Sequence, residues 1–184
     1  MNPYENCPVF EGANYLLRLV EPDDAPSLLT VYSDEKSLPL FNSDNCTYGF
    51  YCASLEQMQE TISAWLQEYR EKSFVRWAVV DKGHDWAVGT IELFNRQSED
   101  SFHNCGILRL DLKSEYERED VIEEILSLIL PSAFELFECK LLATKIPPVA
   151  SRRKAAMEKA GFTATEERLA GSHGTYGDYY ILRG

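Results

Sequence analysis

The residue types that most often bind metals are scattered in this sequence. Three histidines lie far apart in contexts typical of turns (His84, His103 and His173). Five cysteines, an odd number without a C-x-x-C pair, are spread along the chain (Cys7, Cys46, Cys52, Cys105 and Cys139). Because zinc sites and disulfide frameworks need suitably spaced or paired ligands, we predict no bound metal and reduced, mostly buried thiols.

Charged residues offer more chemistry and gather in two clusters. Residues 113–124 contain six acids and two bases, a local charge of −4. A second cluster, Ser151-Arg152-Arg153-Lys154, places a hydroxyl before three cations. Such cations can clamp a phosphate, but a charged run is more often a solvated helix face, and Ser151 is more often an N-cap.

The hydrophobic pattern predicts the elements that must position these residues. Seven strands are expected, at residues 15–20, 74–80, 87–94, 106–112, 140–146, 163–169 and 176–182. Four helices are expected, at about 21–32, 54–69, 120–137 and 150–160. Nothing in the composition marks a linker, so residues 1–184 are interpreted as one domain.

Residues that typically begin, kink or end helices refine this outline. Ser54 with Gln57 predicts a capped start of the second helix, and Asp120 is expected to be the N-cap of the third. Pro131 is expected to kink that third helix, and Gly161 to end the fourth in a left-handed conformation. Residues 33–54 show no sustained periodicity and are interpreted as an irregular, aromatic-lined segment.

This order of elements resembles the GNAT N-acetyltransferases over about residues 15–183. The pieces that carry the resemblance are residues 16–24 (LLRLVEPDD), 88–93 (VGTIEL), 112–116 (LKSEY), 150–153 with 158–162 (ASRR, EKAGF) and, more weakly, 176–180 (YGDYY). The ribosomal-protein and spermidine acetyltransferases are the branch that the chain looks most like. The resemblance implies an α/β (α+β) domain with a mixed, mostly antiparallel sheet of six or seven strands, about four flanking helices and a V-shaped cleft.

The resemblance further implies acetyl-CoA as co-substrate. Its pantetheine arm would lie where strand 106–112 diverges from strand 140–146, held by backbone groups near Leu110 and Leu112. Its pyrophosphate would lie on the N-terminus of the following helix, where free N–H groups and the helix dipole favour an anion. The residues expected around it are Arg118, Glu119, Asp120, Val121, Ser151 and Arg152.

The sequence departs from the family pattern at this phosphate loop, which commonly reads Gln/Arg-x-x-Gly-x-Gly/Ala. Residues 117–122 read Glu-Arg-Glu-Asp-Val-Ile instead. The acids would repel a pyrophosphate, and an Asp120 N-cap would occupy the N–H groups that it needs. Arg118 and the cations of the Ser151 cluster could offset part of this repulsion. Pro148 also replaces an Asn that binds the cofactor in many family members.

The family chemistry is direct attack of a primary amine on the thioester, without a covalent enzyme intermediate. Glu92 and Asp111, on strands near the expected cleft, are the candidates for the base that takes a proton from the acceptor ammonium. Met157 occupies the position of the Tyr that often protonates the leaving thiolate, so Ser151 is the remaining candidate acid. The aromatic segment between Phe41 and Tyr51, which includes Tyr48, would either line the acceptor pocket or pack in the core.

The net charge limits the classes of partner that the chain is expected to bind. The 184 residues include 30 acids and 18 bases, for a net charge of −12, of which −8 falls in residues 1–60. Nucleic acid and anionic membranes are therefore disfavoured, and a cationic acceptor such as a polyamine or a basic peptide N-terminus is favoured. No stretch approaches the roughly 18 apolar residues of a membrane span, so a cytoplasmic location is expected. Homodimer formation is left open.

Two functions follow from these observations. The first is an N-acetyltransferase that moves acetyl from acetyl-CoA to a small cationic or peptide amine. The second is a GNAT-fold binding or regulatory module that has lost acetyl-CoA binding. Between them lies a different acyl-CoA pose, or another anchored acyl donor, with Arg118 and Arg152 reaching the phosphates. Binding of coenzyme A in the cleft at residues 110–120 would separate these functions.

Overall fold

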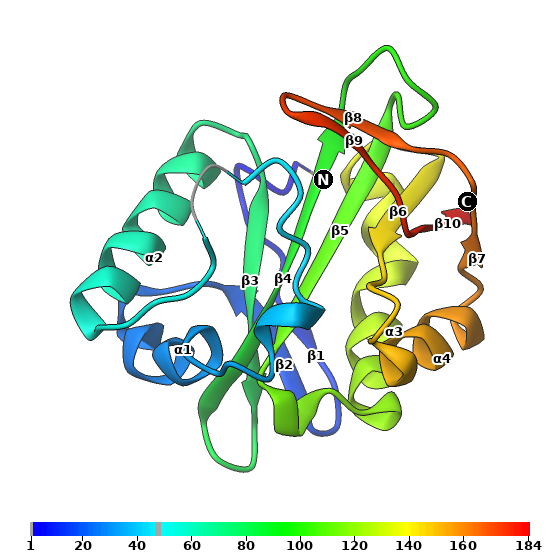
Figure 1. Ribbon diagram of the computed structural model, residues 1–184. Helices are drawn as coiled ribbons and strands as arrows, with labels where there is room; N and C mark the ends of the chain where they lie inside the picture. The colour runs from blue at the N-terminus through cyan, green and yellow to red at the C-terminus, as the bar shows by residue number, and fades with distance from the viewer. Residues whose placement is uncertain (1, 47–48) are drawn as a thin grey trace.

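A central eight-stranded sheet organises the chain, in the order β1-β2-β3-β4-β5-β6-β10-β7 (Figure 1). The computed structural model describes residues 2–46 and 49–184. The strands of the sheet are β1 (Phe10–Glu11), β2 (Tyr15–Leu19), β3 (Val75–Asp81), β4 (Trp86–Arg96), β5 (Cys105–Leu112), β6 (Leu141–Lys145), β7 (Thr163–Ala164) and β10 (Tyr179–Arg183). Every neighbouring pair is antiparallel except β5 and β6, which are parallel. The predicted mixed, mostly antiparallel architecture is confirmed.

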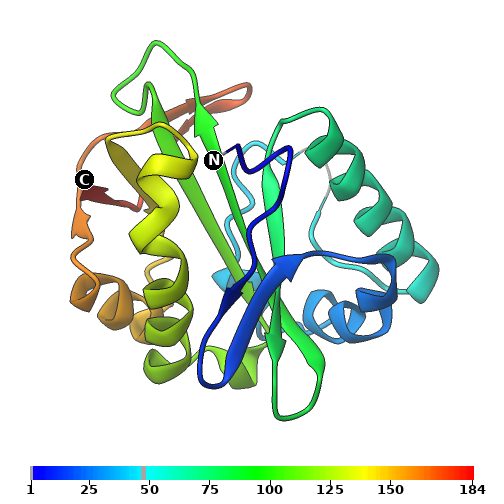
Figure 2. The ribbon, with the colours of Figure 1, turned by 180° about the vertical axis from the view of Figure 1, so that it is seen from behind.

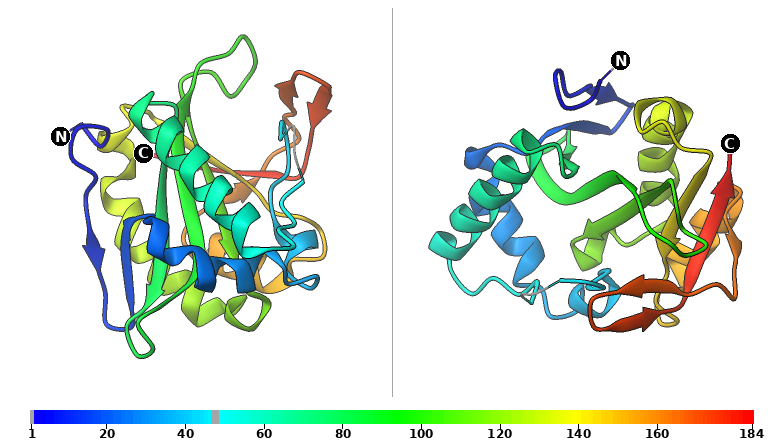
Figure 3. Two further views of the ribbon diagram at one scale, coloured as in Figure 1. Left: turned by 90° about the vertical axis from the view of Figure 1, so that its left-hand side faces the viewer. Right: turned by 90° about the horizontal axis from the view of Figure 1, so that it is seen from above.

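Helices cover both faces of the sheet (Figure 3). The helices α1 (Ala25–Tyr32) and α2 (Leu55–Arg70) share a buried cluster with Ala78 and Val80. The helices α3 (Glu119–Leu136) and α4 (Ser151–Lys159) share the larger core with Trp77 and Ile91 on the opposite face. The N-terminal segment packs beside α3 on that face (Figure 2). Alternation along β3 therefore separates the two cores.

Local signals account for several element boundaries. Ser54 accepts a hydrogen bond from the backbone N–H of Gln57, as predicted for the start of α2. Gly161 has a φ of 98° after α4, which confirms its left-handed conformation. Pro131 lies inside α3, and the helix continues beyond it to Leu136. No helix in the described ranges is long and apolar enough to cross a membrane.

The strand expected over residues 163–169 is only partly formed. Two of its residues, in β7, pair with β10, the Thr165 N–H donates to the Tyr179 carbonyl at 3.1 Å, and the polar residues that follow leave the sheet. The chain then forms a separate hairpin of β8 (Leu169–Gly171) and β9 (Gly174–Tyr176), so the strand expected over 176–182 begins only at Tyr179. The short edge strand β1, which was not expected, brings the main sheet to eight strands, slightly more than the six or seven expected.

The two parallel strands separate halfway along β5. Pairing of β5 with β6 joins Gly106 to Leu142 and ends at Leu108 and Thr144, whereas pairing of β5 with β4 continues to Leu112. Figure 1 shows the two strands diverging toward the end of the molecule where α3 begins. The predicted V-shaped opening is therefore present, and we call it the splay.

Candidate active site

The splay exposes an unpaired strand edge. The Lys113 N–H donates to the Val88 carbonyl, at 3.0 Å, so the odd-numbered residues of β5 direct their peptide groups toward β4. The peptide groups of Leu110 and Leu112 must then point to the β6 side, where β6 has diverged. Neither residue has a backbone hydrogen bond across that edge to any part of the chain that the structure describes.

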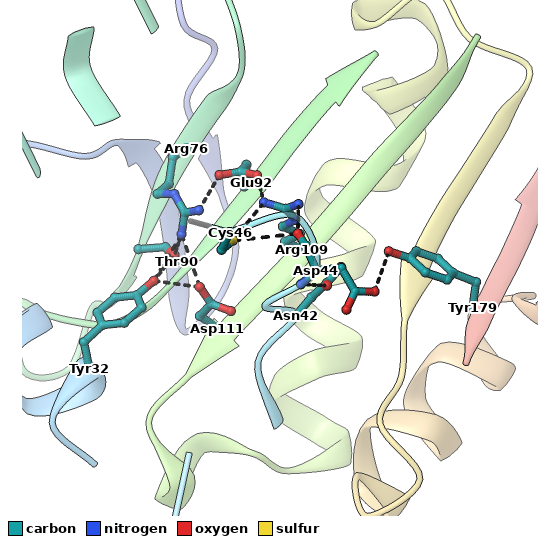
Figure 4. A network of polar contacts seen from close by, with 10 residues as sticks. All are labelled: Tyr32, Asn42, Asp44, Cys46, Arg76, Thr90, Glu92, Arg109, Asp111 and Tyr179. Carbon is teal, nitrogen blue, oxygen red and sulfur yellow. Dashed lines mark hydrogen bonds and ion pairs between the residues drawn. The ribbon is translucent and has the colours of Figure 1, made fainter. Parts of the chain in front are cut away.

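Beside this edge, a cross-strand ion network lies on the α1–α2 face of the sheet. Arg76 on β3, Glu92 on β4 and Arg109 on β5 are direct neighbours in register. The Arg76 guanidinium pairs with Glu92 Oε2, and Arg109 Nη1 lies 3.3 Å from Glu92 Oε1. Both oxygens of this fully buried carboxylate are thus engaged by cations (Figure 4).

Asp111 is buried in the same network but is only half engaged. Its Oδ2 accepts hydrogen bonds from the Tyr32 hydroxyl at 2.8 Å and from Arg76 Nη1 at 3.2 Å. Its Oδ1 is buried and has no hydrogen-bond partner among the described residues. Burial raises the pKa of the Asp111 carboxyl, and the Arg76 guanidinium acts in the opposite direction. Of the two predicted base candidates, Asp111 is the one with a free oxygen.

Residues 37–46, which we call the strap, cross from α1 to the far side of the splay. Asp44 anchors the strap, because its carboxylate lies 2.6 Å from Lys145 Nζ on β6 and 3.1 Å from the Tyr179 hydroxyl on β10. The Asp44 carbonyl also accepts a hydrogen bond from Arg109, at 3.0 Å. Earlier in the strap, the Leu40 carbonyl accepts a hydrogen bond from Arg153 of α4, at 2.8 Å. The strap is therefore tied to the elements on both sides of the splay.

A pocket of about 680 Å³ opens between α2 and the ion network. Arg76, Glu92 and Arg109 line its floor, and Phe50, Tyr51 and Trp65 are among its aromatic wall residues. The aromatic segment divides between the two uses expected of it, because Phe41 is buried, with its ring centroid 5.4 Å from that of Tyr32. Tyr48 lies outside the described residues.

The start of α3 differs from the prediction at Asp120. The N-cap residue is Arg118, and Asp120 lies inside the first turn. The Asp120 carboxylate pairs with the exposed Arg118 guanidinium, whose Nε is 3.1 Å away. The first α-helical hydrogen bond runs from the Ile122 N–H to the Arg118 carbonyl, so the N–H groups of residues 119–121 have no backbone partner in the described ranges. The predicted Asp120 N-cap is wrong, but the Asp120 carboxylate, whose pKa Arg118 lowers, still accepts from the backbone N–H groups of Asp120 and Val121, which lower that pKa further. An anion that binds this helix end must displace that carboxylate.

Most acids of residues 113–124 are compensated locally. Four of them have an ion-pair partner: Glu115 with Lys113, Glu117 with Arg153, Asp120 with Arg118, and Glu123 with Lys159. Glu124 instead accepts hydrogen bonds from Asn14, at 2.7 and 2.8 Å. Lys113 and Arg118 are already counted in the local charge of −4, so the two outside partners, Arg153 and Lys159, reduce the charge that an approaching phosphate meets to −2.

The cationic cluster at the start of α4 also differs from the prediction. Arg153, expected on a solvated face, is 1% exposed and forms two 2.7 Å hydrogen bonds with the Glu117 carboxylate. Ser151 is the first residue of α4 and is exposed, whereas the N-cap is Ala150, so the predicted Ser151 cap is wrong. Arg152 is exposed beside it. Met157 is fully buried in the core.

These residues fit a coenzyme A molecule. Leu110 and Leu112 present an open strand edge to an extended pantetheine arm. Residues 119–121 have N–H groups without a backbone partner, which a pyrophosphate would reach once the Asp120 carboxylate has moved away. Ile122, which replaces a small residue of the family loop, is fully buried in the core and does not obstruct the helix end.

Several residues of the site were not predicted from the sequence. They are Tyr32, Asn42, Asp44, Arg76, Arg109 and Tyr179. A signal existed for the two arginines, because each lies within an apolar strand run, and a charge in a buried strand requires a partner. No comparable signal marks the strap.

The chain was compared with protein families and with proteins of known sequence and structure. A family model described as an acetyltransferase (GNAT) domain matches residues 14–163. No curated protein matches the chain in sequence.

Similar solved structures are enzymes of one fold. A Vibrio cholerae protein assigned as a ribosomal-protein-serine acetyltransferase has a TM-score of 0.73 and 16% identity, covering 100% of both chains. The ribosomal-protein-S5-alanine acetyltransferase of Vibrio fischeri has a TM-score of 0.70 and 17% identity, covering 95% of this chain and 94% of that one. A ribosomal L7/L12 alpha-N-protein acetyltransferase in complex with coenzyme A has a TM-score of 0.71 and 10% identity, covering 96% and 98%. At these identities the similarity establishes the fold.

Proposed function

The chain belongs to the GNAT acetyltransferase domain family, and from that premise we propose that it transfers an acetyl group from acetyl-CoA to a primary amine in the pocket beside the splay. The observation that carries this proposal is the open edge of β5 at Leu110 and Leu112, next to a buried carboxylate, Asp111, that keeps one free oxygen. The donor site and a base candidate thus lie on adjacent residues of one strand.

The donor is held from the splay to the start of α3. Acetyl-CoA supplies the acetyl group as a thioester, from which coenzyme A departs as a thiolate. The backbone groups of Leu110 and Leu112 bind the pantetheine arm in the manner of an added strand. The N–H groups of Glu119, Asp120 and Val121 bind the pyrophosphate, and Arg118 turns from Asp120 to meet it. Exposed Arg152 and Ser151 face solvent at the start of α4 and complete the phosphate site.

Asp111 serves as the base in this proposal. Glu92 would have to break its ion pair with Arg76 or Arg109 before it could accept a proton. Asp111 Oδ1 has no such contact to break. Tyr32 and Arg76 fix the other Asp111 oxygen, so the free one is held in place, and a water can carry the proton to it. Because Met157 is buried, the leaving thiolate takes its proton from Ser151 or from solvent.

The acceptor is a primary amine that carries further positive charge, either a small cation or a peptide. Among the acids of residues 1–60, Asp24 and Asp44 provide little of the attraction, since both are paired inside the molecule. Glu60 and Glu68 on α2 line the pocket instead, and neither forms an ion pair with a described residue. That two similar structures are ribosomal-protein acetyltransferases supports a peptide amine as one possibility.

Calorimetric titration of acetyl-CoA and coenzyme A into the purified protein tests the donor site first. We expect dissociation constants in the micromolar range, followed by acetyl transfer in a screen of polyamines and basic peptides. Absence of binding at millimolar coenzyme A would overturn the proposal and leave the alternative of a GNAT fold reused as a binding or regulatory module. A preference for uncharged amines would overturn the acceptor class alone.

A further inference from the structure

Asn42 in the strap has an unused hydrogen-bond donor. Its side chain is 2% exposed, and its Oδ1 accepts a hydrogen bond from the Asp44 N–H at 3.0 Å. Only the oxygen of an amide can accept, so this contact fixes which end of the Asn42 amide points back to the strap. The Nδ2 end is buried and forms no hydrogen bond of ordinary length with a described residue. Burial raises the pKa of the Tyr179 hydroxyl, and the nearby Asn42 amide acts to lower it.

The strap holds Asn42 at the mouth of the splay. Two positions before it, the Leu40 carbonyl is bound by Arg153 of α4; two positions after it, Asp44 is bound by Arg109 of β5 and Lys145 of β6. Figure 4 shows Asn42 between Asp111 and Arg109 on one side and Tyr179 on the other. The strap that carries this donor is therefore anchored on both sides of the splay, where the proposed function places the pantetheine arm.

We infer that Asn42 is a further catalytic residue, whose Nδ2 donates a hydrogen bond to the carbonyl oxygen of the thioester. This inference rests on the proposed function. The acceptor nitrogen attacks the carbonyl carbon, and the carbonyl π electrons move to the oxygen, where Asn42 stabilises the developing negative charge. The carbon–oxygen double bond then re-forms, the carbon–sulfur bond breaks with its electron pair leaving on sulfur, and the amine proton passes to Asp111.

A preorganised donor is effective in this position because it has nothing to rearrange when the charge develops. The same oxygen can also accept from the open backbone edge of β5, and a second donor from another element would complete the site. Buried orphan donors are uncommon in folded proteins, and one at a reaction centre is explained when the substrate supplies its partner.

Two substitutions distinguish the role of the Asn42 Nδ2 donor from the role of the Asn42 oxygen in holding the strap. Asn42→Asp keeps an oxygen for the Asp44 N–H and removes the donor, whereas Asn42→Ala removes both. Asn45 provides a matched control on the same strap, because its Oδ1 accepts from the Ser172 N–H at 3.2 Å and its side chain is exposed. Asn45→Asp therefore makes the same chemical change away from the splay.

The experiment measures steady-state acetyl transfer and, by calorimetry, the dissociation constant for coenzyme A, which lacks the acetyl carbonyl. We expect kcat to fall roughly 10²–10³-fold in N42D and N42A, the usual loss for one oxyanion donor. The affinity of N42D and N42A for coenzyme A should stay at the wild-type value. The control N45D should keep the wild-type melting temperature.

Two results would overturn the inference. One is kcat in N42D within threefold of the wild type. The other is a loss of kcat in N42A that is matched by an equal loss of coenzyme A affinity, since that pattern indicates that the strap no longer packs as in the wild type. If N42D does not fold, N42A decides by the same comparison. Failure of the proposed function is recognised separately, because the wild-type protein would then neither bind coenzyme A nor transfer acetyl.

Discussion

Asp111 and Glu92 are buried carboxylates on neighbouring strands that differ in what their oxygens contact. Asp111→Asn retains the shape of the side chain and removes its ability to take a proton. We expect kcat to fall roughly 10²–10⁴-fold, as is typical when a general base is lost, with coenzyme A binding unchanged by calorimetry. Glu92→Gln serves as the comparison. If this variant folds, binds coenzyme A and loses more kcat than Asp111→Asn, Glu92 and not Asp111 is the base.

The pH dependence of the wild-type enzyme provides a second test of Asp111. A base must be ionised to act, so kcat/KM rises with pH until the base is deprotonated and then levels. Burial raises the pKa of the Asp111 carboxyl, which moves this rise above the value of about 3.9 that an ordinary Asp shows. The limb due to the acceptor ammonium shifts when the acceptor is changed, whereas the Asp111 limb stays in place and disappears in Asp111→Asn. A profile whose only limb follows the acceptor would argue against Asp111.

At the scale of elements, the Glu117–Arg153 pair joins the start of α3 to α4 and, through the Leu40 carbonyl, to the strap. Arg153→Met leaves the Glu117 carboxylate buried without its cation. We expect the free energy of unfolding to fall by about 3–5 kcal/mol, measured by urea denaturation. The double variant E117Q/R153M should recover part of this loss, because no uncompensated charge remains.

Arg152 is the neighbouring control for this prediction. Its side chain is exposed, so Arg152→Met is expected to change the free energy of unfolding by no more than about 0.5 kcal/mol. The same variant should weaken coenzyme A binding if Arg152 reaches the phosphates. Equal stability of Arg152→Met and Arg153→Met would contradict the structural role of the Glu117 pair.

The elements differ in how far the sequence predicted them. Periodicity located β3, β4, β5 and all four helices, and the Ser54 cap located the start of α2, because those signals are local. The strap was interpreted only as irregular, since its order comes from contacts distant in sequence: Asp44 and Lys145 are 101 positions apart. The misplaced cap at Asp120 has a different, local origin, because Arg118, two residues earlier, pairs with its carboxylate.

For the proposed site, the resemblance to a family indicated Leu110, Leu112 and the start of α3, and the residues themselves indicated Glu92 and Asp111 as titratable groups on strands. Which of these two keeps a free oxygen depends on the positions of Arg76 and Arg109 across the sheet. Strand register, and not strand content, decides this. Even across the short β3–β4 turn the register shifts between Val79 and Val80, which the strand pattern does not reveal.

At the scale of the whole molecule, the net charge of −12 is distributed unevenly between paired and unpaired acids. Many acids near the splay are compensated, whereas Glu60 and Glu68 at the pocket form no ion pair with a described residue. In the proposed function, the overall field and these two side chains would draw a positively charged acceptor toward the pocket.

This distribution predicts a salt dependence that depends on the acceptor. Opposite charges attract less as ionic strength rises, so kcat/KM for a polyamine or basic peptide should fall several-fold between about 0.02 and 0.3 M salt. For a monoamine whose only charge is the reacting ammonium, kcat/KM should fall less under the same conditions. The double variant E60Q/E68Q should raise KM for the multivalent acceptor and flatten its salt dependence, while kcat and coenzyme A affinity stay unchanged. Identical salt slopes for the two acceptors would show that the acidic surface does not select the substrate.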